Sequence, residues 1–105
     1  MTASFVSRVF ELRSATGIEP IALELSVPEP DPLGGAWRCR LRLRGASLAI
    51  DQSAYGEDGL QALLLALEMA RVLLTTTPWP ADTSLTWCEG SDLGLPTPPP
   101  SAPAA

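Results

Sequence analysis

The stretch Trp37-Arg38-Cys39-Arg40-Leu41-Arg42-Leu43-Arg44 decides the fold, because apolar and charged side chains alternate along it without interruption. Successive side chains of a strand point to opposite faces of a sheet, so this period of two predicts a strand with one buried and one wet face. Such strands are typical of antiparallel sheets that pack on a core through a single face. The apolar face carries Trp37, Cys39, Leu41 and Leu43, and the wet face carries Arg38, Arg40, Arg42 and Arg44.

Weaker strand signals lie on both sides of this stretch. The predicted strands are residues 5–12, residues 21–27, residues 37–44, a short strand at Leu48 and Ile50 after a turn at Gly45-Ala46, and residues 85–87. In the second strand the side chains that share the apolar face are Ile21, Leu23, Leu25 and Val27. The proline-rich segment 28–35 is expected to be a loop, because proline cannot donate a ladder hydrogen bond.

One long helix is expected after the fourth strand. Asp58 is a typical N-cap residue, and Gln61 three positions later completes a capping-box pattern. The helix should end near Thr75, shortly before Pro78, because the residue before a proline disfavours helix. The predicted fold is therefore α+β, with a four- to five-stranded antiparallel sheet packed on one long helix in the order β-β-β-β-α-β.

The chain has 105 residues, which is enough for one domain. We expect this single domain to cover residues 1–95. Residues 96–105 are dominated by proline and alanine and offer no large apolar anchor, so they are expected to form a disordered tail.

The predicted helix is apolar over more of its circumference than one sheet can cover. At 100° per residue the apolar arc is about 240° wide, whereas packing on a single sheet needs little more than about 100°. The candidate surface residues on this surplus face are Leu65, Met69 and Val72. Either loops, the last strand and Trp79 cover the face within one chain, or it is a seam between two copies. We favour a homodimer, because two-fold assemblies are the commonest.

The four arginines of the wet face form the second candidate surface. Alternate residues of a strand lie about 6.6 Å apart, so the guanidinium groups form a row about 20 Å long. Arginine recognises carboxylates and phosphates with two parallel hydrogen bonds, which would suit an acidic protein, a nucleic acid or a phosphorylated ligand. The simpler interpretation is a solvated face with cross-strand ion pairs to Glu11, Glu24 or Asp51.

Composition limits the class of protein. The net charge is −5, with seven arginines and no lysine, which argues against general nucleic-acid binding. The first residues do not form a signal peptide, and the apolar segment 60–74 is interrupted by polar residues, so we expect a cytoplasmic protein that does not enter a membrane. Arginine without lysine, together with much alanine, leucine and proline, is typical of a GC-rich bacterial genome.

The chain contains no histidine. This removes Ser-His and Cys-His nucleophilic machinery and the common zinc ligand sets. Cys39 and Cys88 are not spaced as a metal-binding pair, and Cys39 is expected to be a small buried residue. We therefore expect no catalytic residues, no metal and no cofactor, and we expect that the protein is not an enzyme.

The segment Tyr55-Gly-Glu-Asp-Gly-Leu-Gln-Ala-Leu-Leu-Leu-Ala-Leu-Glu68, preceded by Trp37-Arg-Cys39, resembles an uncharacterised family of small bacterial domains. In that family a Trp-x-Cys strand precedes a Gly-x-Asp-x-Leu-Gln-Ala-Leu helix. The resemblance covers about residues 5–96 and implies a compact domain without an assigned activity, so it transfers no functional residue.

Two hypotheses for the function follow. The first is a non-enzymatic protein-interaction module, homodimeric and able to bind another protein, in the manner of an immunity- or inhibitor-type domain that neutralises a basic partner. The second is a small-molecule-binding domain with a cavity between helix and sheet, lined by Trp37, Tyr55 and Met69. A large enclosed apolar cavity would favour the second, and an exposed apolar patch the first.

Overall fold

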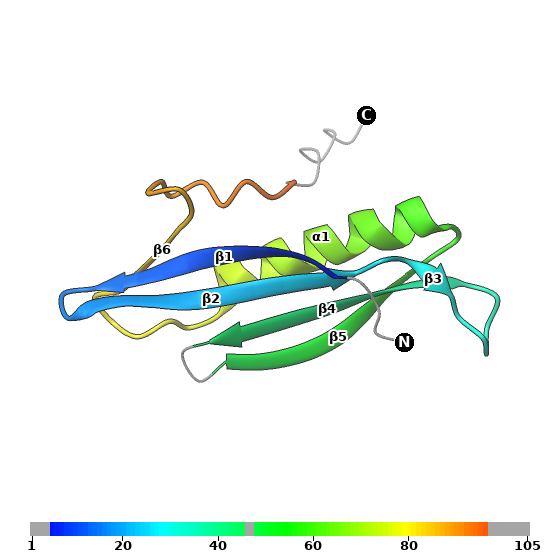
Figure 1. Ribbon diagram of the computed structural model, residues 1–105, viewed down its shortest axis with the longest axis horizontal. Coiled ribbons are helices and arrows are strands. Elements are labelled where there is room, and N and C mark those ends of the chain that lie inside the picture. Colours follow the sequence, from blue (N-terminus) through cyan, green and yellow to red (C-terminus); the bar gives the residue numbers. More distant parts are fainter. Residues whose placement is uncertain (1–4, 46–47, 97–105) are drawn as a thin grey trace, which may run out of the picture.

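The computed structural model describes residues 5–45 and 48–96, and it shows one helix lying across an antiparallel sheet (Figure 1). The elements are β1 Phe5–Ser14, β2 Gly17–Ser26, β3 Glu29–Pro30, β4 Trp37–Gly45, β5 Leu48–Gly56, α1 Gly59–Thr76 and β6 Ser84–Thr86. The predicted α+β class, the single helix and the order of elements are confirmed. The sheet has six strands, because the two-residue β3 lies within the segment that we expected to be a loop. The predicted tail lies outside the described residues except for Pro96.

The sheet is a meander whose strands lie in the order β6-β1-β2-β4-β5, all antiparallel. Two residues join β1 to β2 and two join β4 to β5, whereas residues 27–36, which include β3, connect β2 to β4. β6 comes after the helix and returns to the free side of β1, where Leu85 lies opposite Leu12. β5 is much longer than the short strand expected from Leu48 and Ile50, and all nine of its residues pair with β4.

A bulge separates β2 from β3 along the same side of β4. Leu25 pairs with Leu41 and Glu29 pairs with Arg38, so three residues of one chain segment lie opposite two residues of β4. The extra residue breaks the alternation. Ser26 is buried, with its Oγ accepting a hydrogen bond from the Arg40 backbone nitrogen at 2.8 Å. The prediction that Val27 faces the core is wrong, because the bulge leaves Val27 58% exposed.

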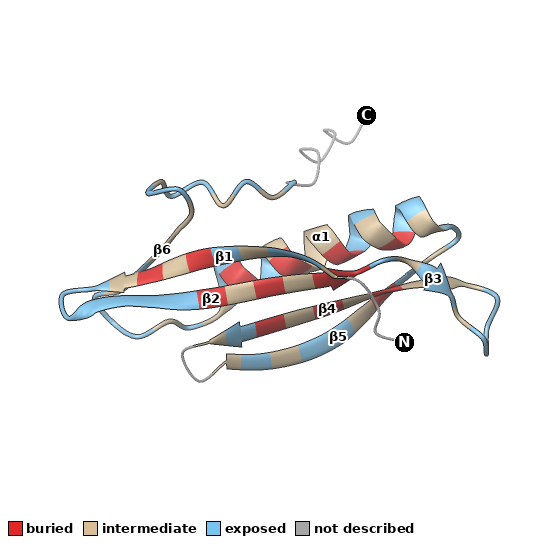
Figure 2. Cartoon of the chain, in the orientation of Figure 1, coloured by how far each residue is buried: buried red, intermediate tan, exposed pale blue. Residues whose placement is uncertain are grey.

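The two faces of the sheet differ as predicted. The inner face and the helix bury one apolar core, shown by the buried bands on β1, β2, β4 and α1 in Figure 2. Its largest fully buried side chains are Phe10, Ile21, Leu41, Leu43, Leu74 and Cys39. The outer face carries the four arginines of β4, which register with Ala49, Asp51, Ser53 and Tyr55 of β5.

Helix α1 starts immediately after β5 and lies over β4 and β5. Asp58 caps it, since its Oδ1 accepts a hydrogen bond from the Gln61 backbone nitrogen at 2.8 Å. The Gln61 side chain completes a variant of the predicted capping box, with Oε1 accepting from the Glu57 backbone nitrogen rather than from that of Asp58. The contact with the sheet is close, because a Cβ added to Gly56 would lie 2.5 Å from the Ala62 backbone nitrogen.

Only one narrow stripe of the helix is fully buried. Its members are spaced four apart, and they are Ala62, Ala66, Ala70 and Leu74. Residues four apart lie on one face of a helix. Because three of the four are alanines, the helix axis can approach the sheet closely, and the larger leucines are left on the two flanks of this stripe.

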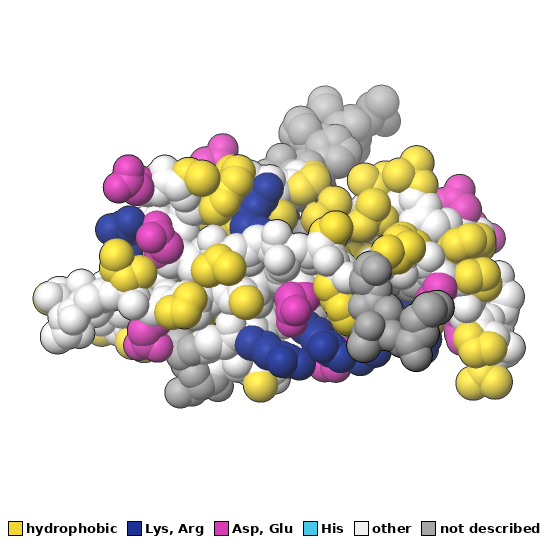
Figure 3. All heavy atoms as spheres, viewed as in Figure 1, with side chains coloured by type: hydrophobic (Ala, Val, Ile, Leu, Met, Phe, Trp, Pro, Cys, Tyr) yellow, Lys and Arg dark blue, Asp and Glu magenta, His cyan; other side chains and the backbone are white. Residues whose placement is uncertain are grey.

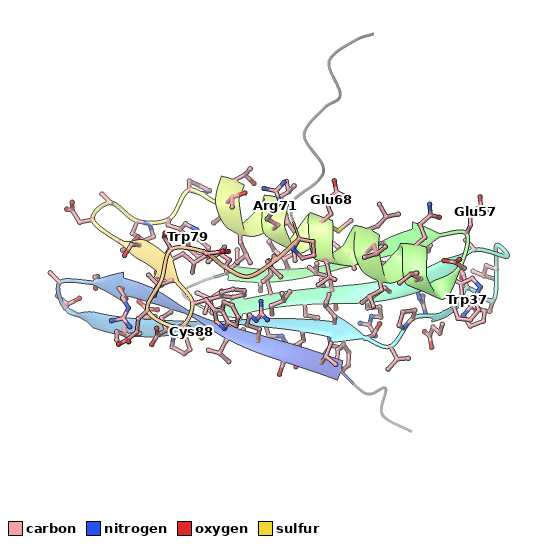
Figure 4. The ribbon with its side chains drawn as sticks, turned by 90° about the horizontal axis from the view of Figure 1, so that it is seen from above. Trp37, Glu57, Glu68, Arg71, Trp79 and Cys88 are labelled. Atoms are coloured by element: carbon pink, nitrogen blue, oxygen red, sulfur yellow. The ribbon has the colours of Figure 1, made fainter. Side chains whose placement is uncertain are left out.

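The end of the helix is fixed by an aromatic side chain. The Trp79 indole nitrogen donates a hydrogen bond to the Leu74 carbonyl oxygen at 3.0 Å, which satisfies one of the last carbonyls of the helix. Figure 4 shows Trp79 between the end of α1 and β6. After β6 the chain forms a tight turn in which Trp87 and Gly90 exchange two backbone hydrogen bonds, and Cys88 is exposed at its tip.

Candidate interaction surfaces

Most of the arginine row is paired within the chain. Arg38 contacts Glu29 at 2.8 Å, and Asp51 contacts Arg40 at 3.1 Å and Arg42 at 3.6 Å. The hydrogen bond that Arg38 donates to the Glu29 carboxylate raises the pKa of Arg38 above its ordinary value. Figure 3 shows basic side chains gathered over β4 with acidic ones beside them. Asp51 is therefore the ion-pair partner that the simpler interpretation of the row predicted.

The other two predicted partners do not pair with the row in the described part of the chain. Glu11 contacts Arg13 at 2.9 Å instead, and Glu24 lies opposite Arg42 in the register without an ion pair. Arg44, at the end of the row, is exposed and makes no ion pair with residues 5–45 or 48–96. The row is thus largely neutralised by carboxylates, and Arg44 alone of the four has no ion-pair partner among the described residues.

The surplus apolar face of the helix is exposed on one flank. Leu65 and Val72 are 39% and 43% exposed, and Met69 is half-buried at the edge of the core. Leu67 faces β1 and β2, because it lines a groove together with Leu23. Positions two apart on a helix point about 200° apart, so Leu65 and Met69 lie on the opposite flank, which faces the β5 edge of the sheet.

β5 forms one edge of the sheet. In the described part of the chain β5 pairs with β4 alone, so its other edge presents unpaired backbone groups along nine residues. Natural proteins commonly protect such edges with proline, lysine, a bulge or a short strand length. β5 contains no proline and no lysine, and its register with β4 is continuous.

Helix α1 also has the length and mean hydropathy of a membrane span, at 18 residues and 1.4, with 22% of that window buried. Core helices of compact domains pass the same test. Here Ala62, Ala66 and Ala70 are buried against the sheet, and Figure 4 shows Glu68 and Arg71 on the side of the helix away from it.

A groove that the sequence did not reveal lies between α1, the ends of β1 and β2, and residues 94–96. Its volume is about 390 Å³, and Val6, Leu23, Leu25, Leu67 and Leu95 line it together with the charged Arg8. The one sequence signal was Arg8 itself, which shares the inner face of β1 with Phe10 and Leu12.

The cavity that we predicted between helix and sheet does not bring its three residues together. Trp37 packs against Gly59, whose added Cβ would lie 3.2 Å from its ring. Tyr55 belongs to the outer face and is 52% exposed, and it borders a shallow hollow with Gly35 and Gln61. Met69 lies on the flank of the helix that faces β5. Figure 4 shows Trp37 beside Glu57 at one end of the molecule.

Comparisons with known proteins assign a family without an activity. The family model described as Domain of unknown function (DUF6968) matches residues 6–97. No curated protein and no solved structure matches the chain. Within residues 5–45 and 48–96, no group of three or more Cys, Asp or Glu side chains is placed to hold a metal ion.

Proposed function

Since the chain belongs to this family of unknown function, over residues 6–97, we propose that it is a non-enzymatic protein-interaction module that acts as a homodimer. The observation that carries the proposal is the juxtaposition of the open β5 edge with the exposed helix flank of Leu65, Met69 and Val72. A second copy that continued the sheet at β5 would bring its own α1 alongside the first and cover both flanks.

The sequence of β5 suits pairing with itself. A two-fold axis through Gln52, the middle residue of Leu48–Gly56, pairs all nine residues antiparallel. Ile50 then lies opposite Ala54 of the second copy on the inner face, and the two Gln52 side chains meet on the axis between the two such pairs. Such isologous interfaces are the usual way in which two identical chains close on each other.

The charges of the outer face are compatible with this register. Asp51 falls opposite Ser53 of the second copy, which in turn registers with Arg40 on its own β4. The carboxylate therefore meets a hydroxyl and arginines rather than the second Asp51. A register shifted by two residues, with the axis at Asp51, would place two carboxylates opposite each other, which is unfavourable.

The first test is native mass spectrometry with charge substitutions on the two helix flanks. Leu65→Glu or Val72→Glu should convert the dimer to a folded monomer, because each would bury a carboxylate in the seam. Leu64→Glu is the matched control, since Leu64 is 50% exposed on the other flank and its substitution should leave the dimer intact. Circular dichroism verifies that each variant is folded.

A cross-linking test examines the register without disturbing the helix. In a Cys88→Ser background, Gln52→Cys places two thiols opposite each other on the proposed axis, and oxidation should give a covalent dimer. Ala49→Cys is the control, because residue 49 lies opposite residue 55 of the second copy. A monomeric wild-type protein at tens of micromolar concentration, or equal cross-linking of both variants, would contradict the proposal.

The rest of the proposal rests on composition. The net charge of −5 and the missing histidine support an inhibitor-type binder that neutralises a basic protein in the cytoplasm rather than an enzyme. We expect the domain to bind neither nucleic acid nor membrane, because its net charge is negative and three arginines of the row are paired with Glu29 or Asp51. The groove beside Arg8 favours, as a second candidate, binding of a small molecule.

A further inference from the structure

We propose that the groove beside Arg8 is a binding site for an aliphatic monocarboxylate, which would place its acid group on Arg8 and its chain between Leu67 and the sheet. The site is independent of the proposed dimer, because it lies on the opposite flank of α1 from Leu65. Its volume of about 390 Å³ falls in the range of pockets that bind small molecules.

The position of Arg8 is unusual for a charged residue. It follows the inward alternation of β1 between Val6 and Phe10, where an arginine would otherwise lose its hydration in the core. The chain fixes it there on one side: Nη1 donates to the carbonyl oxygens of Leu93 and Gly94, each at 3.0 Å, and the guanidinium stacks on Trp87.

These contacts use the Nη1 donors of Arg8 and one face of its guanidinium plane, which stacks on Trp87. The Nε and Nη2 donors form no hydrogen bond within the described part of the chain, and neither atom is buried. This edge of an arginine binds a carboxylate through two parallel hydrogen bonds. Holding Arg8 on its other side leaves the edge oriented in advance, which lowers the ordering cost of binding.

The surroundings of Arg8 select the kind of anion. Among residues 5–45 and 48–96, no acidic side chain lines the groove and none forms an ion pair with Arg8. Besides Arg8, Ser7 and Gly94, the groove is lined by the apolar side chains of Val6, Leu23, Leu25, Leu67, Leu95 and Pro96. Apolar walls on both sides of a single charge suit a monoanion with an alkyl chain, and they disfavour phosphates and polyanions, which need several donors.

Isothermal titration calorimetry with decanoate, kept below its micelle-forming concentration, tests the site on the intact chain. We expect saturable binding of one decanoate per chain, and binding about fourfold tighter for each added methylene between octanoate and decanoate. Decan-1-ol has the same chain without the charge and should bind at least about tenfold more weakly if the Arg8 contact contributes.

Two valines of β1 provide a matched pair of variants. Val6 is 62% exposed in the groove and Val9 is 55% exposed on the outer face of the same strand. Val6→Glu adds a carboxylate that competes for Arg8 and should weaken decanoate binding at least about tenfold, given the strength of such pairs. Val9→Glu should leave binding unchanged.

The proposal is overturned if wild-type protein shows no saturable binding of decanoate, if decan-1-ol binds equally well, or if both valine variants behave alike. Binding of a pentapeptide with an apolar C-terminal residue in place of decanoate would also overturn the assignment, because it would identify the site as a peptide-terminus pocket. The titrations of the wild-type protein do not depend on any variant folding.

Discussion

Arg8 lies over the indole of Trp87, with its Cζ atom 3.8 Å from the ring centroid. The same guanidinium donates hydrogen bonds to the backbone carbonyl oxygens of Leu93 and Gly94, which lie 85 and 86 positions further along the chain. A cation over an aromatic face is attracted by the ring quadrupole. Arg8, near the start of β1, therefore holds the segment that follows β6 against the end of the core. The packing of this segment also depends on Gly94, which lies against the Trp87 ring.

Gly94 should be intolerant of any side chain. Its φ of +67° is costly for other residues, and an added Cβ would lie 2.7 Å from Trp87 Cε3 and 2.9 Å from Arg8 Nη1. Gly94→Ala should lower the free energy of unfolding by about 2–4 kcal/mol, combining backbone strain and overpacking. Urea denaturation measures the change.

Gly35 is the control that measures the cost of a positive φ without overpacking. Its φ is +72°, and an added Cβ would meet nothing within 4 Å. Gly35→Ala should therefore cost only the conformational strain, about 1–2 kcal/mol. Equal losses for the two substitutions would show that Trp87 does not pack on Gly94 as described.

The ion pairs of Asp51 should contribute little to stability. Its side chain is 54% exposed, and it contacts both Arg40 and Arg42. Asp51→Asn should lower the free energy of unfolding by less than about 1 kcal/mol, because exposed ion pairs are weak, and the difference should shrink in 1 M salt. Urea denaturation at low and high salt measures both effects.

A charge reversal distinguishes paired from merely neighbouring groups. Arg40→Glu with Arg42→Glu should destabilise the protein by about 1 kcal/mol through repulsion with Asp51. Adding Asp51→Arg should restore most of that loss. If the variant with all three substitutions is no more stable than Arg40→Glu with Arg42→Glu alone, Asp51 does not form ion pairs with Arg40 and Arg42.

The fold could be predicted from the sequence where neighbouring residues alone determine the structure. The alternation from Trp37 to Arg44 defined β4 and both faces of the sheet, and Asp58 with Gln61 marked the start of α1. In each case the signal is local: side-chain direction in a strand has a period of two, and a cap acts within one turn.

Other features depend on contacts between distant residues. The length of β5 is set by its pairing with β4, since Asp51-Gln52-Ser53 has low strand propensity on its own. The bulge that exposes Val27 arises from Ser26 and from the pairing of β3. Arg8 appeared only as a break in an apolar pattern, because its partners Trp87, Leu93 and Gly94 are far away in the sequence.

The N-cap of α1 should contribute measurably to stability. Asp58 Oδ1 accepts from the Gln61 backbone nitrogen, which would otherwise lack an intrahelical partner. Asp58→Ala should lower the free energy of unfolding by about 0.5–2 kcal/mol, and Asp58→Ser should retain most of the stability because serine is also a good cap. Thermal denaturation followed by circular dichroism compares the two, and an equal loss for both would contradict a capping role.

Cys39 should make the protein less stable at alkaline pH. Burial raises the pKa of its thiol above the ordinary value of 9.0, so the folded protein keeps the thiol protonated while the unfolded chain ionises. The stability due to this group is fully present below pH 9 and is lost as the pH rises toward the folded-state pKa. Above pH 9 the loss should approach, and not exceed, about 1.4 kcal/mol per pH unit.

Urea denaturation between pH 8 and pH 10.5 under reducing conditions measures this loss of stability. Cys39→Ala is the control, because it retains the exposed Cys88 and Tyr55 but removes the buried thiol. If the variant and the wild-type protein lose stability in parallel over this range, the dependence arises from other groups and Cys39 is not held in its neutral form by the core.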